Sequence, residues 1–127
     1  MVIGHVAIYA RDLEALRAFY ANYFAAASNG GYHNPRTGLR TYFLSFGDGA
    51  RLEIMHRPGL EPPSGAAPRE GLAHIAFQLE SPEAVDRLTE RLRKDGYTVE
   101  SGPRTTGDGY YESCVLDPEG NRVELVG

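Results

Sequence analysis

The chain has 127 residues, of which 42% are hydrophobic and 24% are charged, as in an ordinary globular domain. Its formal net charge is −4, so we expect no basic surface that would neutralise nucleic-acid phosphates. The sequence has no apolar span of about 18 residues and no N-terminal leader pattern, which predicts a cytoplasmic protein that does not associate with membranes.

The first segment has the pattern of a strand followed by a helix. β-branched and aromatic residues recur over Val2–Tyr9, and strand alternation places His5 on the opposite face from Val6 and Ile8. Asp12 stands where a helix N-cap is expected. The helix after it is amphipathic, because apolar residues recur at helical spacing: Leu13, Leu16, Phe19, Tyr20, Tyr23 and Phe24.

A hairpin is predicted next. Residues 29–39 hold three glycines and a proline, and we interpret them as a loop or a ragged strand. Arg40–Phe46 and Arg51–Met55 then flank a Gly-Asp-Gly turn at 47–49, a pattern typical of two paired strands. Glu53 lies inside the second arm of this hairpin.

The second half repeats the strand and the helix. A strand is predicted over Ala73–Leu79, followed by Ser81 as N-cap with Pro82 at the first helical position. Gly96 is expected to end this helix. Its predicted apolar face consists of Val85, Leu88 and Leu92.

A second hairpin closes the chain. Tyr97–Glu100 is predicted to be a short strand, and the Gly-containing segment 102–109 is predicted to be a loop. Tyr110–Leu116 and Arg122–Val126 are expected to pair around a turn at 117–120. The second half therefore has the same order of elements as the first.

This order predicts an α+β fold of two βαβββ modules. The modules span 1–57 and 72–127, and the segment 58–71, which holds half of the 8 prolines, is predicted to link them. Because one such module cannot cover its own sheet, we expect the two, related by pseudo-twofold symmetry, to bury their open faces together or against a partner. Their curled antiparallel sheets would then form a shared cleft.

Each half carries one His and one Glu at matching places. Gly4-His5-Val6-Ala7-Ile8 is matched by the segment 71–77, which contains His74, and Glu53 in Arg51–Ile54 is matched by Glu124 in Arg122–Leu125. If the four side chains converge, two imidazoles and two carboxylates would surround one point. Such a set suits Zn²⁺, Ni²⁺, Co²⁺ or Fe²⁺, and the absence of thiolate argues against a closed structural zinc.

One cysteine and two histidines could also bind a metal by their chemistry, but we do not assign them to the site. Cys114 has no second cysteine to pair with and no neighbouring cation, so it is predicted to be a small buried residue. His33 and His56 have no counterpart in the other half and are predicted to be solvated, although either could approach the mouth of the cleft.

The repeated His and Glu, together with Ala73–Phe77 and Leu116–Leu125, resemble the vicinal oxygen chelate superfamily over the whole chain. That superfamily contains glyoxalase I, methylmalonyl-CoA epimerase, extradiol dioxygenases, fosfomycin-resistance thiol transferases and bleomycin-binding proteins. Small bacterial glyoxalase I enzymes use His, Glu, His and Glu in this order. The resemblance therefore implies a divalent metal, Ni²⁺ or Zn²⁺ first and Co²⁺, Fe²⁺ or Mn²⁺ as alternatives, held by His5, Glu53, His74 and Glu124.

The implied activity is that of a metal-dependent lyase or isomerase of lactoylglutathione lyase type. It would act on the hemithioacetal of a 2-oxoaldehyde by proton transfer through a metal-bound enediolate. Glu124 is expected to be ligand and general base, with Glu53 as the pseudo-symmetric alternative. Glutathione-dependent members commonly have Arg and Asn where this chain has Tyr9 and Arg57, so the thiol stays open.

Two other functions stay open. The first is another enzyme of the superfamily, an epimerase or an extradiol-type dioxygenase. The second is a non-enzymatic protein that binds a small molecule or antibiotic, although relatives of that kind generally lack the metal ligands. We also expect a homodimer, because a second copy commonly covers the exposed sheet edges of so small a chain, and the ligands could meet within one chain or across two.

Overall fold

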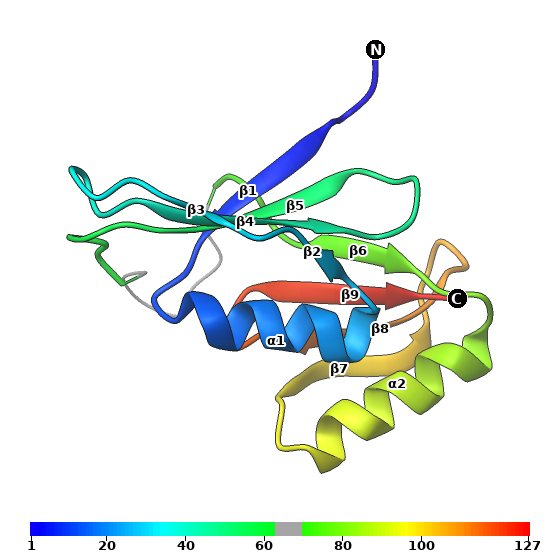
Figure 1. Ribbon diagram of the computed structural model, residues 1–127. Helices are drawn as coiled ribbons and strands as arrows, with labels where there is room; N and C mark the ends of the chain where they lie inside the picture. Colours follow the sequence, from blue (N-terminus) through cyan, green and yellow to red (C-terminus); the bar gives the residue numbers. More distant parts are fainter. Residues whose placement is uncertain (63–69) are drawn as a thin grey trace. The chain divides into compact units, whose positions relative to one another are not determined.

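A computed structural model describes residues 1–62 and 70–127 of the protein. The chain divides into two compact units, Met1–Ser64 and Gly65–Gly127, each made of one sheet and one helix (Figure 1). The α+β class and the two βαβββ modules are confirmed. Part of the predicted linker 58–71 lies outside the described residues. No helix in the described parts has the length and apolar character needed to cross a membrane.

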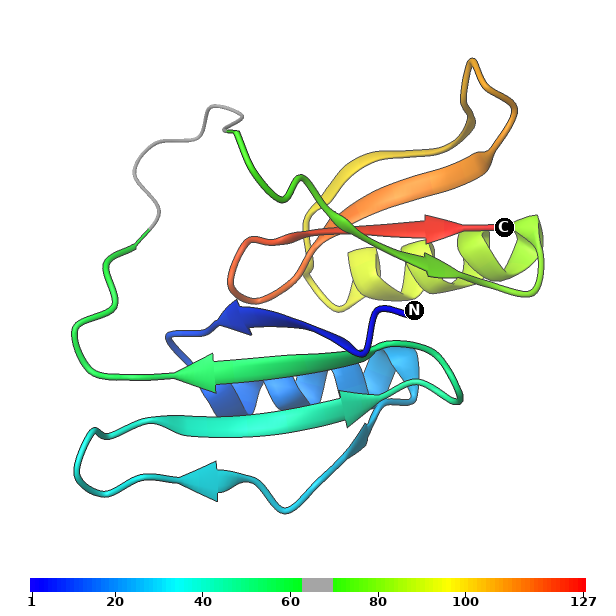
Figure 2. The same cartoon turned by 90° about the horizontal axis from the view of Figure 1, so that it is seen from above.

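The first unit has a mixed sheet with the strand order β1-β5-β4, and two short strands share the far edge of β4 (Figure 2). Within the segment 29–39, predicted to be a loop or a ragged strand, Tyr32 and His33 form β3, whereas β2 lies just before this segment. Between the two strands, the Asn29 side chain accepts hydrogen bonds from Gly31 N and Phe43 N. The elements are β1 (His5–Tyr9), α1 (Leu13–Phe24), β2 (Ala27–Ser28), β3 (Tyr32–His33), β4 (Arg40–Ser45) and β5 (Arg51–His56).

Helix α1 starts where the sequence predicts. The Asp12 carboxylate accepts a hydrogen bond from Ala15 N at 3.0 Å, which satisfies one of the free donors of the first turn. The helix packs against β4 and β5 on one face of the sheet (Figure 2). Its buried residues meet the buried side chains of those strands: Leu13, Leu16, Phe19 and Tyr20 on the helix, and Leu44, Leu52 and Ile54 on the sheet.

The second unit has the strand order β6-β9-β8-β7. Ser81 accepts a hydrogen bond from Ala84 N, and Gly96, with φ +89°, ends the helix in the left-handed region, so both predicted ends are confirmed. The buried Thr89 and Ser113 hydroxyls form a 2.6 Å hydrogen bond between helix and sheet. The elements are β6 (Ile75–Gln78), α2 (Pro82–Lys94), β7 (Val99–Thr105), β8 (Tyr111–Leu116) and β9 (Arg122–Val126).

Several strand ends in this unit differ from the prediction, and two of the differences concern the site or a predicted loop. β6 begins at Ile75, so His74 immediately precedes the strand instead of lying within it. β7 continues to Thr105 through Gly102 and Pro103, which the sequence assigned to a loop. The register with β8 shifts twice along this stretch, so irregular pairing accommodates residues that ordinarily break a strand.

Each sheet also contains one parallel pair of strands. Val6 of β1 lies opposite Leu52 of β5, and Ile75 of β6 lies opposite Val123 of β9, with both pairs of strands parallel. The helix after the first strand of each unit supplies the crossover connection that a parallel pair requires. The sheets are therefore mixed, which corrects the expectation of wholly antiparallel sheets.

Alternation along the strands gives each sheet a helix face and an opposite face, which we call the site face. The helix faces carry the buried residues of the two cores, whereas most side chains on the site faces are partly or fully exposed. In the first unit the site face includes His5, Ala7, Tyr9, Phe43, Arg51, Glu53 and Met55; in the second it includes Ala76, Gln78, Cys114, Arg122 and Glu124.

Candidate functional site

The first predicted pair, His5 and Glu53, meets on the site face of the first unit. The parallel register places Ala7 opposite Glu53, so His5, two residues earlier on β1, is diagonal to the glutamate. His5 Nε2 lies 3.7 Å from Glu53 Oε2, and the two side chains are 46% and 16% exposed. The pair is thus reachable from solvent on the imidazole side and largely covered at the carboxylate.

The second pair, His74 and Glu124, has a similar arrangement in the second unit. His74 Nε2 lies 3.2 Å from Glu124 Oε2, with side-chain exposures of 41% and 22%. The turn before β9 fixes the start of the glutamate's strand. There Asp117 Oδ1 accepts hydrogen bonds from Glu119 N and Asn121 N, both at 2.9 Å, so the turn is bonded internally.

The donor atoms of each pair fit one divalent metal. Two ligands at about 2.1 Å from an ion, with an angle of roughly 90–110° between them, lie about 3.0–3.4 Å apart. The observed separations of 3.2 and 3.7 Å require little or no movement to reach that range. Residues 1–62 and 70–127 contain no group of three or more His, Cys, Asp or Glu placed to hold a metal. Each unit therefore offers two donors, and a four-donor site would need both pairs.

An aromatic ring and a cation lie beside the first pair. Phe43 stands opposite Glu53 on β4, and its ring meets the His5 ring edge-on at a centroid distance of 5.4 Å. The Arg51 guanidinium carbon lies 4.5 Å over the same Phe43 ring. At the other end of β5, Arg57 lies 5.6 Å over the ring of Tyr9. Arg51 could have been noticed in the sequence, because Arg122 occupies the matching place in the second half. The sequence alone, however, did not predict a role for Arg51.

A thiol and an ion pair lie beside the second pair. Cys114 stands opposite Glu124 on β8, and burial, reinforced by the nearby Glu100 carboxylate, raises the pKa of its thiol to about 11. Glu100 accepts two hydrogen bonds from Arg122, at 2.5 and 2.9 Å, and this contact lowers the pKa of the carboxyl. The prediction that Cys114 is buried is confirmed, although it lies on the site face and not against the helix.

The two remaining histidines both belong to the first unit and are not part of its His5–Glu53 pair. His56 is half-buried, and its Nδ1 donates to the Ala10 carbonyl oxygen at 2.8 Å, so the prediction that it is solvated is wrong. The carbonyl comes from the segment that leads into α1, which the sequence did not place next to β5. His33 is exposed, as predicted.

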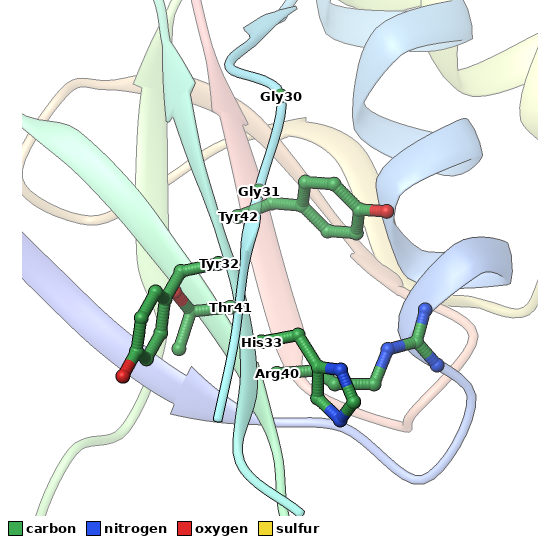
Figure 3. A pocket seen from close by; sticks show the side chains of 7 residues that line it. All are labelled: Gly30, Gly31, Tyr32, His33, Arg40, Thr41 and Tyr42. Carbon is green, nitrogen blue, oxygen red and sulfur yellow. The ribbon is translucent and has the colours of Figure 1, made fainter. Parts of the chain in front are cut away.

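His33 lines a shallow hollow of about 220 Å³ at the β3 edge (Figure 3). Figure 3 shows Tyr32 lying beside Thr41, while Arg40 and Tyr42 extend on the other side. Both Arg40 and Tyr42 donate hydrogen bonds to Glu14, at 2.9 and 2.8 Å, so the charge in the hollow is compensated. None of the four predicted ligands lines it.

Comparisons with known proteins extend over nearly the whole chain. The model of the Glyoxalase/Bleomycin resistance protein/Dioxygenase superfamily matches residues 2–125. The chain is 35% identical over 130 residues to the uncharacterized protein YqjT of Bacillus subtilis (strain 168), covering 96% of this chain and 95% of that one.

Solved structures of the same family are also similar to this chain. The glyoxalase family protein from Enterococcus faecalis has 28% identity and a TM-score of 0.79, over 98% of this chain and 96% of that one. Lactoylglutathione lyase from Agrobacterium tumefaciens has 25% identity and a TM-score of 0.69, over 98% and 92% of the two chains.

Proposed function

The chain belongs to the glyoxalase/bleomycin resistance protein/dioxygenase superfamily, and we propose that it is a metal-dependent lyase or isomerase of glyoxalase I type. Its substrate would be the hemithioacetal of a 2-oxoaldehyde. The observation that carries the proposal is the pairing of one His with one Glu at the same place in each unit, at 3.7 and 3.2 Å. The similarity to a lactoylglutathione lyase supports the same activity.

His5, Glu53, His74 and Glu124 would hold the metal, with Ni²⁺ or Zn²⁺ as the first candidates and Co²⁺, Fe²⁺ or Mn²⁺ as alternatives. When bound, the ion would act as a Lewis acid and stabilise negative charge on the substrate oxygens. Imidazole nitrogen and carboxylate oxygen are suitable donors for such an ion. We propose a homodimer, in which the site forms either within one chain or between the two chains.

Glu124 is the proposed general base. A proton on carbon beside a carbonyl must be removed and returned to the neighbouring carbon, and a carboxylate can do both. Glu124 is 22% exposed, so a substrate can reach it, while its contact with His74 restricts its position. The nearby Cys114 keeps its proton at neutral pH, because the pKa of its thiol is about 11, and so does not compete as a base. Glu53 is the alternative base in the first unit.

The test is turnover by protein loaded separately with Ni²⁺ and Zn²⁺. Hemithioacetals of methylglyoxal with glutathione, mercaptoacetate and 2-mercaptoethanol would be offered, and thioester formation followed by absorbance. We expect metal-dependent thioester formation with at least one thiol. Absence of turnover with every thiol would reject the glyoxalase assignment, and oxygen consumption with a catechol and Fe²⁺ would instead indicate a dioxygenase.

A further inference from the structure

The two units carry an arginine at the same place, two residues before the glutamate of each pair. Arg51 opens β5 and Arg122 opens β9. The strand registers agree, since Val6 lies opposite Leu52 in one unit and Ile75 lies opposite Val123 in the other. The two arginines therefore occupy equivalent positions on equivalent site faces, and their surroundings can be compared directly.

Arg122 is neutralised within its own unit. Its Nε and Nη2 donate to the two carboxylate oxygens of Glu100 at 2.5 and 2.9 Å, which is a bidentate ion pair. The planar guanidinium is thus fully matched to a carboxylate of the protein. This arginine has a structural partner and no evident need for another anion.

Arg51 has no such partner within residues 1–62 and 70–127. In the first unit the edge strand β2 next to β4 consists of Ala27 and Ser28, which carry no carboxylate to take the place of Glu100. Among the residues that the structure describes, the Arg51 side chain forms no ion pair, and its guanidinium carbon lies 4.5 Å over the Phe43 ring. The side chain is exposed.

The contact with Phe43 prepares Arg51 to bind an anion. A guanidinium over an aromatic face is held by cation–π attraction, and its edge N–H donors stay free to form paired hydrogen bonds with a carboxylate. The same ring contacts His5 at 5.4 Å. Arg51 and Glu53 are separated by one residue on one strand, which spans about 7 Å. An anion on Arg51 would therefore lie within the length of a small molecule from the His5–Glu53 pair.

We infer that Arg51 is a specificity-determining residue that binds a carboxylate of the substrate next to the His5–Glu53 pair. Its place in the site depends on the proposed function, whereas its ability to bind a carboxylate does not. The carboxylate could belong to the thiol half or to the oxoaldehyde half of a hemithioacetal. Binding of either would place negative charge where this unit has an uncompensated cation.

The experiment compares kcat/KM for three hemithioacetals in the metal-loaded protein. Methylglyoxal with mercaptoacetate carries the carboxylate on the thiol half, 4,5-dioxopentanoate with 2-mercaptoethanol carries it on the carbonyl half, and methylglyoxal with 2-mercaptoethanol is neutral. We expect one anionic substrate to be preferred about tenfold to a hundredfold over the neutral one. In Arg51→Gln this ratio should fall to about one, and in the matched control Arg122→Gln it should persist.

A second variant and a binding measurement keep the inference testable. Arg51→Lys keeps the charge but loses the paired donors, so its ratio should fall several-fold even if Arg51→Gln does not fold. NMR of the wild-type side-chain Nε–H groups should show a saturable shift of Arg51 with mercaptoacetate but not with 2-mercaptoethanol.

The outcomes separate this inference from the proposed function. Turnover without preference for an anionic substrate, or with a preference that Arg51→Gln retains, would overturn the role of Arg51 and leave the glyoxalase assignment standing. If no hemithioacetal is turned over, the NMR titration decides. A saturable Arg51 shift with mercaptoacetate alone would support the carboxylate site, and equal or absent shifts with the two thiols would overturn it.

Discussion

The two site faces share their metal-type donors and differ in what surrounds them. Both have a His–Glu pair and an arginine two residues before the glutamate. Opposite the glutamate, however, the first unit places Phe43 and the second places Cys114. In the second unit Glu100 neutralises the arginine, whereas in the described part of the first unit Arg51 forms no ion pair. The proposed ligands thus occupy equivalent positions in the two units. Their neighbours differ, and those of the first unit form an aromatic, cationic surface suited to binding an anion.

Replacing the two glutamates would show whether the pairs are equivalent in catalysis. We expect Glu124→Gln to lower kcat/KM by about 10²–10⁴-fold, because it would remove a ligand and the general base together. Glu53→Gln should lower kcat/KM less, because it would remove a ligand but not the general base. Glu112→Gln on the neighbouring strand, whose partner Arg104 is 3.9 Å away, is the control and should retain activity. A larger loss in Glu53→Gln would assign the base to the first unit.

Replacing the two histidines would test whether both pairs hold the metal. We expect His5→Ala and His74→Ala each to weaken Ni²⁺ or Zn²⁺ binding by at least about tenfold to a hundredfold, because each removes a nitrogen donor. Titration calorimetry of the metal-free protein would measure this. His33→Ala should bind as the wild type does. If His5→Ala or His74→Ala bound the metal as tightly as the wild type does, the proposal that both pairs hold the metal would be wrong.

The buried thiol of the second site face should resist alkylation. Since the pKa of Cys114 is about 11, against 9.0 for an ordinary thiol, its thiolate fraction at pH 8 is about a hundredfold lower. Iodoacetamide should therefore react about a hundredfold more slowly with the folded protein than with the protein in urea. The difference should shrink as the pH approaches 11, and rapid alkylation of the folded protein at pH 8 would contradict the assignment.

The Glu100–Arg122 ion pair should have a small, pH-dependent effect on stability. The pKa of Glu100 is lowered in the folded state, so its contribution is present above the unfolded pKa and is lost as the pH falls through the folded one. We expect Glu100→Gln to lower the free energy of unfolding slightly at pH 7, because both side chains are more than a third exposed. In urea denaturation the difference should shrink as the pH falls through the folded pKa of Glu100; a difference that grows in acid would contradict this sign.

The sequence predicted most of the fold because its local signals agreed with tertiary packing. Both helices begin at their predicted N-caps, and both His–Glu pairs form within their units. It did not predict the parallel pair Val6–Leu52, because alternation indicates which face a residue occupies and not which strand lies beside it. For the same reason the sequence did not predict the contact of His56 with Ala10 or the position of Arg51 over the Phe43 ring. Convergence of the two pairs on one ion stays a prediction.

The most direct test of the central claim is anomalous diffraction from crystals of the nickel-loaded protein. We predict one strong peak with His5 Nε2, His74 Nε2 and carboxylate oxygens of Glu53 and Glu124 at about 2.0–2.2 Å, supplied by one chain or by two. A peak bound by other residues, or a nickel-loaded crystal with no peak and the two His–Glu pairs more than about 6 Å apart, would contradict it.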